Sequence, residues 1–497
     1  MHLPGRCDIF PMPLSPKLTP EAATANMAEI APRYTPQEAI IEAHRCLFCF
    51  DAPCIQACPT GIDIPSFIKK ITTGNLTGSA RVILSANVLG ASCARVCPTE
   101  VLCEGACVVL DREGDPVKIG RLQRYATDHV LDKKQVLFKP SGNMTGKRIA
   151  VIGGGPAGLG CAAELAQLGY EVVVFEKKPY AGGLNTYGIA YYKMNPQISL
   201  QEVEMIRSLG VEFRCGVEVG KDISLENIQK EFDAIFLGLG LGKGARLNIP
   251  GEDLPEVLEA LDFIEQVHTT PLHKVPVGEC VAVIGGGNTA IDAVTQAKRL
   301  GARDAVIVYR RSQDEMPAYK FEQELAKRDG ARFLFNVAPV EILSNGTGHV
   351  TGLKLARTAS ANGKLQILSG TEVVEPFDMV LKAIGEEKQA GLFKKLLPAL
   401  ELDRRGVVVH NPISGQTNIP NVFTGGDCGN GGREVVNAVA EGKKAARGIH
   451  AFFGGQAVSG PIQPSRHGVK GTPVGAGFDQ PIRVSELEEQ YAREGKL

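Results

Sequence analysis

The chain has 497 residues, of which 44% are hydrophobic and 22% charged, and its formal net charge is −1. This composition is typical of a soluble globular protein, and the balanced charge argues against a nucleic-acid or membrane surface. The first residues lack the apolar run of a signal peptide, and no stretch of about 18 apolar residues follows. We therefore expect a cytoplasmic protein of roughly three domains.

The N-terminal quarter predicts an arm followed by a helical domain. Residues 1–34 are rich in Pro, Ala and Thr and predict an extended arm. The sequence Thr35-Pro36-Gln37-Glu38 is a capping box with proline at the first helical position, so a helix should begin there. Residues 35–140 then show helical patches without convincing strand alternation, which predicts a small all-helical domain.

Eight of the thirteen cysteines lie between residues 46 and 107, in two groups. The first group has the spacing C-x2-C-x4-C-x3-C-P, which is typical of thiolate ligands to iron–sulfur clusters. Structural zinc is the alternative, although zinc sites usually pair two C-x2-C units. In two-cluster ferredoxins the fourth cysteine of such a run binds the other cluster. The spacing leaves open whether Cys93 or another residue completes the second set.

Two strand–glycine turn–helix patterns follow. Residues 148–152 predict a strand, residues 157–168 a helix and residues 171–175 the next strand. The turn Gly153-Gly154-Gly155-Pro156-Ala157-Gly158 fits the G-x-G-x-x-G fingerprint, whose backbone amides approach a pyrophosphate. Glu176 stands where a carboxylate binds ribose hydroxyls. The sequence therefore predicts a dinucleotide site.

The same pattern returns from Val281, with the turn Gly285-Gly286-Gly287-Asn288-Thr289-Ala290 and a strand at 305–309. This strand is followed by Arg310 and Arg311 instead of an acidic residue, which favours the 2′-phosphate of NADP over NAD. The alternative is that the two arginines form a solvated strand end. Residues 421–455 again have a pattern typical of a nucleotide-binding fold. The last forty residues predict a loop that ends in a charged helix at 486–494.

Several motifs together resemble the glutamate-synthase small-subunit-like flavoproteins. They are Arg45-Cys46-Leu47-Phe48-Cys49, Asp51-Ala52-Pro53-Cys54, Ala57-Cys58-Pro59-Thr60 and Val96-Cys97-Pro98-Thr99, followed by the two fingerprints. The resemblance covers about residues 35–455. Within the family the chain is most similar to the branch of dihydropyrimidine dehydrogenase, which includes a separate bacterial electron-input subunit.

The resemblance implies a ligand set for two [4Fe–4S] clusters. One cluster would use Cys46, Cys49, Cys54 and Cys107, and the other Cys58, Cys97, Cys103 and a residue that is not cysteine. In the dihydropyrimidine dehydrogenase branch that residue is a glutamine in an I-G-x-L-Q sequence, which Ile119-Gly120-Arg121-Leu122-Gln123 matches. The glutamate synthase branch has an acidic residue there. The alternative for Gln123 is a surface glutamine on a helix.

The resemblance also implies α/β architecture, with the helical iron–sulfur domain followed by a Rossmann-like FAD domain into which an NAD(P) domain is inserted. We expect the arm at 1–34, the helical domain at 35–140, FAD segments at 146–278 and 386–455, the NAD(P) domain at 279–385 and a tail at 456–497. The implied FAD positions are Gly153 to Gly158, Glu176, Gly182, Gly183, Leu184, Lys193, Gly426 and Asp427. The implied NADP positions are Gly286, Gly287, Asn288, Thr289, Arg310, Arg311, Ala383, Ile384 and Gly385.

One segment departs from the family pattern. Members often carry G-I-P-x-F-K-L-P near the flavin, whereas this chain has Gly188-Ile189-Ala190-Tyr191-Tyr192-Lys193-Met194-Asn195. Both prolines are missing, which puts the conformation of this flavin-adjacent loop in doubt.

The function implied is electron transfer from NADPH or NADH through FAD and both clusters to an FMN-containing dihydropyrimidine dehydrogenase subunit in a heteromer. The sequence assigns no acid–base catalyst. One alternative is the small subunit of NADPH-dependent glutamate synthase or a related oxidoreductase. Another, of a different class, is a non-catalytic assembly protein that binds zinc.

Overall fold

A computed structural model describes residues 17–361 and 364–456. The chain forms two compact units, of which one comprises Arg33–Leu137 and the other contains Phe138–Gly455 together with residues up to Pro32. The predicted tail beyond residue 456 and the first sixteen residues lie outside the described residues.

The unit Arg33–Leu137 is helical throughout, as expected. It contains α2 (Pro36–His44), α3 (Pro53–Ala57), α4 (Ile64–Thr72), α5 (Leu76–Ala86), α6 (Gly90–Val96), η1 (Thr99–Val101), α7 (Val108–Glu113) and α8 (Ile119–Asp132). The predicted capping box is confirmed, because the Thr35 side chain accepts from the Glu38 amide and the Glu38 carboxylate accepts from the Thr35 amide. The apolar faces of α4 and α8 meet in a core that includes Phe67 and Leu122, both fully buried.

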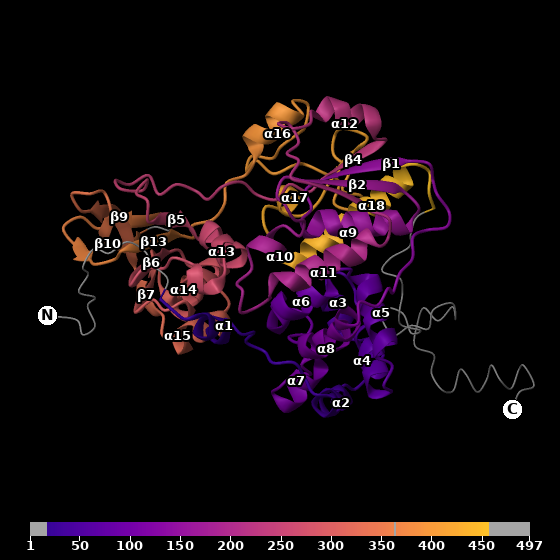
Figure 1. Ribbon diagram of the computed structural model, residues 1–497, viewed down its shortest axis with the longest axis horizontal. Coiled ribbons are helices and arrows are strands. Elements are labelled where there is room, and N and C mark those ends of the chain that lie inside the picture. Colours follow the sequence, from indigo (N-terminus) through magenta and orange to yellow (C-terminus); the bar gives the residue numbers. More distant parts are fainter. Residues whose placement is uncertain (1–16, 362–363, 457–497) are drawn as a thin grey trace, which may run out of the picture. The chain divides into compact units, whose positions relative to one another are not determined.

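The other unit contains two parallel sheets (Figure 1). The first has the order β14-β4-β1-β2-β3, from β1 (Arg148–Ile152), β2 (Glu171–Glu176), β3 (Glu212–Cys215), β4 (Ala234–Leu237) and β14 (Val422–Thr424). Its helices are α9 (Pro156–Gln167), α10 (Leu184–Tyr187), α11 (Pro196–Arg207), α12 (Leu225–Glu231), α16 (Ala390–Leu396), α17 (Asp427–Asn430) and α18 (Val435–Phe452). We call this assembly the first nucleotide module.

Close packing of α18 on α9 brings the last part of the chain to the first fingerprint. A Cβ atom at Gly442 would lie 2.0 Å from the Ala157 carbonyl oxygen, and one at Gly160 would lie 2.8 Å from the Val439 oxygen. Only glycine fits such a helix contact. Because β14 pairs with β4, residues 422–452 complete a sheet that begins at residue 148.

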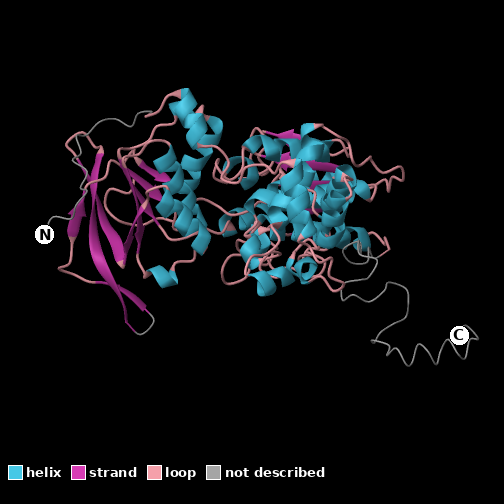
Figure 2. Ribbon diagram, turned by 90° about the horizontal axis from the view of Figure 1, so that it is seen from below, coloured by secondary structure: helices cyan, strands magenta, loops and turns pink. Residues whose placement is uncertain are grey.

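The second parallel sheet has the order β5-β13-β6-β7-β8. Its strands are β5 (Val257–Glu259), β6 (Cys280–Ile284), β7 (Asp304–Tyr309), β8 (Arg332–Phe335) and β13 (Met379–Lys382). The accompanying helices are α13 (Ala260–Thr269), η2 (Leu272–Lys274), α14 (Asn288–Arg299), η3 (Gln313–Glu315) and α15 (Lys320–Arg328). An antiparallel sheet of β9 (Val337–Ser344), β10 (Val350–Ala361), β11 (Lys364–Ile367) and β12 (Val373–Glu375) joins them, and its long strands are prominent in Figure 2. Together these form the second nucleotide module.

The inserted module begins earlier than the predicted boundary at residue 279. Strand β5 pairs in parallel with β13 in the second sheet, and α13 packs on α14, so residues from 257 onward belong to the insertion. The sequence signal was weak because β5 has only three residues and lies at the sheet edge.

The prediction of an extended arm over 1–34 is wrong for residues 20–26, which form helix α1 (Pro20–Asn26). Thr19 caps this helix by accepting from the Ala22 amide, and Pro20 occupies its first position, as at the start of α2. The Asn26 side-chain Nδ2 donates to the Arg299 carbonyl oxygen, and Met27 is buried in the core of the second module. Tertiary packing therefore stabilises a helix too short to form alone.

Candidate functional site: two nucleotide loops and two cysteine groups

The first fingerprint loop connects β1 to α9 and leaves an open cradle. Gly153 has φ +102°, and a Cβ atom at Gly158 would lie 2.0 Å from the Gly153 carbonyl oxygen, so both positions require glycine. Gly155 is different, because its added Cβ atom would meet only the Gly183 Cα atom, at 3.8 Å. The backbone at Gly155 therefore faces space that a bound phosphate could occupy.

Glu176 and the Gly182-Gly183 turn lie against this loop. The Glu176 carboxylate accepts from the Gly154 amide at 2.8 Å and from the Lys178 amide at 2.8 Å. The Gly182 amide donates to the Gly154 carbonyl oxygen at 2.7 Å, and Leu184 then begins α10. The predicted acidic residue and glycine turn thus gather at the fingerprint.

The return segment completes the same cradle from more than 250 residues along the chain. Gly426 has φ +74°, and an added Cβ atom would lie 2.7 Å from the Ala157 Cβ atom. Burial raises the pKa of Asp427, although the Arg433 amide donates to its carboxylate and acts against the shift. Glu441 on α18, which the sequence analysis missed, accepts from the Gly426 amide and the Asn430 side chain. No local motif marks Glu441, because its partners lie 11 and 15 residues earlier and meet it only where the chain turns from α17 into α18.

The second fingerprint has the same construction. Gly285 has φ +143° and its Cβ atom would lie 2.2 Å from the Ala383 carbonyl oxygen, so the residues after β13 pass directly beside the turn. A Cβ atom at Gly286 would strike the Tyr309 ring at 2.5 Å, whereas one at Gly287 would meet nothing within 4 Å. Gly287 thus borders open space, as Gly155 does.

The remaining predicted NADP residues surround this turn. Asn288 and Thr289 open α14, and the Asn288 side chain accepts from the Tyr319 amide. Arg310 and Arg311 follow β7 and are exposed, and Arg311 lies 3.7 Å from Glu315. Ile384 is 38% exposed and Gly385 has φ +96°. Both arginines are thus available to solvent beside the loop that carries Gly286.

Lys193 has partners in the second module. Its ammonium group lies 2.6 Å from Asp292 on α14 and 2.5 Å from Glu322 on α15. Burial alone would lower the pKa of Lys193, but these two carboxylates outweigh it and raise the pKa above its ordinary value.

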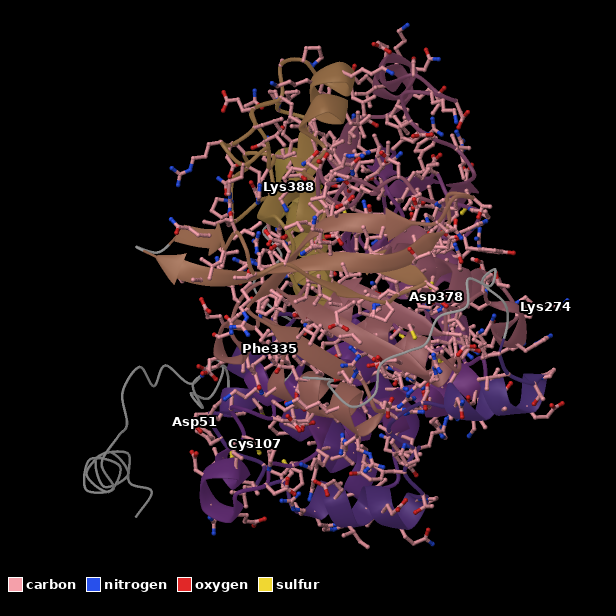
Figure 3. The ribbon with its side chains drawn as sticks, turned by 90° about the vertical axis from the view of Figure 1, so that its left-hand side faces the viewer. Asp51, Cys107, Lys274, Phe335, Asp378 and Lys388 are labelled. Atoms are coloured by element: carbon pink, nitrogen blue, oxygen red, sulfur yellow. The ribbon has the colours of Figure 1, made fainter. Side chains whose placement is uncertain are left out.

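The first cysteine set comes together although Cys107 is distant in sequence. Cys46, Cys49, Cys54 and Cys107 line one apolar cavity with Ile64, Ile68 and Val109. Burial raises the pKa of Cys46 to about 11, and the neighbouring Cys49 and Cys107 add to the shift. Cys49 also lies near Asp51, which Figure 3 labels together with Cys107 on the helical unit. A bound iron–sulfur cluster would have the opposite effect on these thiols, because coordination to a metal deprotonates a thiol outright.

The cysteines of the second set, Cys58, Cys97 and Cys103, also lie close together, and Cys93 lies beside them. The Cys93 side chain hydrogen-bonds Cys97 and is the largest cause of the raised pKa of Cys97, followed by burial; Cys58 and Cys103 also lie close enough to contribute. Gln123 on α8 is only 6% exposed, so the alternative of a surface glutamine is wrong. Its Nε2 donates to the Gly90 carbonyl oxygen at 2.7 Å, at the start of α6, which carries Cys93.

The donor chemistry fits iron–sulfur clusters. In the part of the chain that the structure describes, no three His, Cys, Asp or Glu side chains converge on a position suited to a single metal ion. A [4Fe–4S] cluster has different requirements, because each thiolate binds a different iron of the cube and the four sulfur atoms stay apart. A cavity lined by four cysteines matches that requirement.

Comparisons with known proteins agree with this geometry. Residues 23–135 match the family model described as dihydropyrimidine dehydrogenase domain II, 4Fe-4S cluster, and residues 147–442 match pyridine nucleotide-disulphide oxidoreductase. The glutamate synthase [NADPH] small chain of Halomonas elongata is 38% identical over 441 residues, which cover 85% of this chain and 92% of the relative. The chain belongs to the glutamate-synthase small-subunit-like family.

A second relative represents the other branch of this family. The NAD-dependent dihydropyrimidine dehydrogenase subunit PreT of Escherichia coli is 34% identical over 427 residues, or 86% of this chain and 97% of the relative. Among solved structures, FprA of Mycobacterium tuberculosis in complex with NADPH covers 62% of this chain and 85% of its own, with a TM-score of 0.51 and 22% identity. That likeness shows a shared fold.

The protein is therefore an NAD(P)H-dependent oxidoreductase subunit with FAD and [4Fe–4S] clusters as cofactors. Within the described ranges, no helix is long and apolar enough to cross a membrane.

Proposed function

We propose that the chain oxidises NAD(P)H and passes the electrons through FAD and two [4Fe–4S] clusters to an FMN-containing dihydropyrimidine dehydrogenase subunit in the cytoplasm. The observation that carries the choice of partner is Gln123. This residue matches the glutamine of the pyrimidine branch, and it is buried with its Nε2 atom already bound to the Gly90 carbonyl oxygen. Because this bond uses the amide nitrogen, the amide oxygen is the ligand atom that we propose.

We assign the first nucleotide module to FAD and the second to NAD(P)H. FAD held in the first module would supply the conversion of a two-electron hydride into the single electrons that iron–sulfur clusters accept. The chain itself supplies the cradle: amides of the loop around Gly155 for the pyrophosphate, Glu176 for the ribose, and the segment at Gly426 and Asp427 for the flavin side. Gly286 to Thr289 would hold the second pyrophosphate, and Ala383 to Gly385 would border the nicotinamide.

We assign the clusters by the two cysteine groups. Cys46, Cys49, Cys54 and Cys107 bind one cluster, which is supported by the cavity that all four line. Cys58, Cys97, Cys103 and Gln123 bind the other. Cys93 is then a neighbour of Cys97 and not a ligand, which its hydrogen bond to that cysteine supports.

Arg310 and Arg311 support NADPH as the preferred donor. Both are exposed beside the second fingerprint, and Arg311 lies 3.7 Å from the half-exposed Glu315 carboxylate. A guanidinium recognises a phosphate through two parallel hydrogen bonds, which suits the 2′-phosphate.

A second function is favoured by a different observation. The Halomonas elongata glutamate synthase small chain is more similar to this chain than PreT is, at 38% against 34% identity over comparable lengths. Delivery of electrons to a glutamate synthase large subunit is therefore the competing proposal, and the ligand at position 123 is what separates the two.

The partner is tested by reconstitution. Protein purified without oxygen should oxidise NADPH with an artificial acceptor but should not reduce uracil alone. With an added FMN-containing dihydropyrimidine dehydrogenase subunit, one NADPH and one proton should be consumed for each uracil converted to dihydrouracil. Reduction of uracil by the chain alone, or coupling only to a glutamate synthase large subunit, would contradict the proposed partner.

A further inference from the structure

The segment 188–195 leaves the first module and becomes part of the core of the second. It follows α10, whose preceding turn lies against the first fingerprint, and α10 itself packs beside α13 (Figure 1). Ala190 and Tyr192 are fully buried in the same core as Phe263 of α13 and Ile291 of α14. Tyr192 is among the largest fully buried side chains of the described residues.

Polar contacts fix this segment along its length. The Ile189 carbonyl oxygen accepts from His268 at 2.5 Å, and the Tyr191 amide donates to the Gln296 side chain at 3.0 Å. The Tyr192 hydroxyl donates to Asp292 at 3.2 Å. Each of these three partners belongs to α13 or α14, so all three bonds join the segment to helices of the second module.

Lys193 completes this attachment with a buried ion triad. Its ammonium group lies between Asp292 and Glu322, and all three side chains are about 10% exposed or less. Buried ion pairs add little to stability compared with apolar residues of the same size, because desolvation opposes the attraction. Their directional contacts instead select one arrangement of the groups that they join. Asp292 lies one turn into the helix that begins at the second fingerprint, so the triad fixes the helix that holds the dinucleotide.

We propose that Lys193 is a positioning residue: with Asp292 and Glu322 it holds the second nucleotide module in the orientation on the first that hydride transfer requires. The catalytic part of this inference rests on the proposed function, in which the two fingerprints hold FAD and NAD(P)H. The loop lacks both prolines of the family pattern. Side-chain contacts with α13 and α14, rather than proline rings, define the loop.

A charge-matched double variant tests the triad. Lys193→Met with Glu322→Gln keeps the net charge of the triad at −1 and removes the ion pairs between modules. We expect flavin reduction by NADPH in stopped flow, measured per bound FAD, to slow at least tenfold, while the dissociation constant of NADP⁺ changes less than threefold. The single variant Lys193→Arg should keep most of the wild-type rate of flavin reduction.

The chain offers a control of the same chemistry. Lys382 is 8% exposed and lies 2.8 Å from Glu252 and 2.7 Å from Glu259, and this triad lies within the second module and its entry loop. Lys382→Met with Glu252→Gln should lower the unfolding temperature but keep the rate of flavin reduction within threefold of wild type. A rate for the Lys193 double variant within threefold of wild type would overturn the inference.

Hydrogen exchange separates failure of this inference from failure of the proposed function. Amides of 188–195 should exchange at least tenfold faster in the Lys193 double variant and not in the Lys382 control. If wild type accepts no hydride from NADPH or NADH, the proposed function is wrong, but the exchange result still decides whether Lys193 joins the modules. Unchanged exchange at 188–195 would refute the attachment itself.

Discussion

Substitution of Gly155 by alanine isolates cofactor binding from folding. Gly155 has φ −78°, which any residue adopts, and its added Cβ atom would have one neighbour, the Gly183 Cα atom, at an ordinary 3.8 Å. We therefore expect the free energy of unfolding of the apoprotein to change by less than about 0.5 kcal/mol. The new methyl group would instead point into the cradle where the FAD pyrophosphate is proposed to lie.

The Gly155→Ala substitution should instead weaken the binding of FAD. Inserting a methyl group into a closely packed contact costs about 1–3 kcal/mol. Since about 1.4 kcal/mol corresponds to a factor of ten in affinity, the dissociation constant for FAD should rise roughly 5- to 150-fold. Gly158→Ala provides the contrast, because its Cβ atom would lie 2.0 Å from the Gly153 carbonyl oxygen and the apoprotein itself should be destabilised.

The assay combines urea unfolding of the apoproteins with titration of FAD followed by flavin fluorescence. Wild type, Gly155→Ala and Gly158→Ala are compared under the same conditions. Wild-type affinity for FAD in Gly155→Ala would refute the placement of the pyrophosphate at this loop. Equal destabilisation of the two variant apoproteins would refute the claim that the space beside Gly155 can hold a methyl group.

Three other predictions follow from the structure. Gln123→Cys should change the EPR signal of one cluster and leave the other unaltered, and identical spectra would contradict the ligand assignment. Arg310→Gln with Arg311→Gln should weaken NADPH binding by at least about tenfold, since each charge-assisted hydrogen bond contributes about 1.5–3 kcal/mol, while NADH binding changes little; equal loss for both donors would argue against 2′-phosphate recognition. Burial acts to raise the pKa of Asp233, but the Lys147 ammonium and the Arg148 amide outweigh it and lower the pKa in the folded state. The contribution of Asp233 to the free energy of unfolding is therefore present above the unfolded pKa of about 3.9 and is lost as pH falls through the folded pKa. Asp233→Asn should destabilise the protein at pH 7 and match the stability of wild type in strong acid, which circular dichroism can follow.

Much of the architecture follows from local sequence. The capping box at Thr35 and the two glycine turns identify where a helix and two βαβ units begin, because glycine positions and side-chain caps act within a few residues. The cysteine spacing predicts iron–sulfur ligation for a similar reason, since short intervals limit the geometry. The helix at Pro20–Asn26 was missed although it carries the same Thr-Pro start, because its burial against the second module is not a local property.

The sequence alone determined two dinucleotide folds, a clustered thiolate set and a glutamine in a recognisable motif. Tertiary structure decided what these groups meet. It brought Cys107 to the cavity of Cys46, Glu441 to the loop at Gly426, and Lys193 to Asp292 and Glu322. The physical reason is separation along the chain: these contacts span from 15 residues, for Glu441 and Gly426, to 129 residues, for Lys193 and Glu322, and arise from helix and sheet packing, which no local spacing encodes.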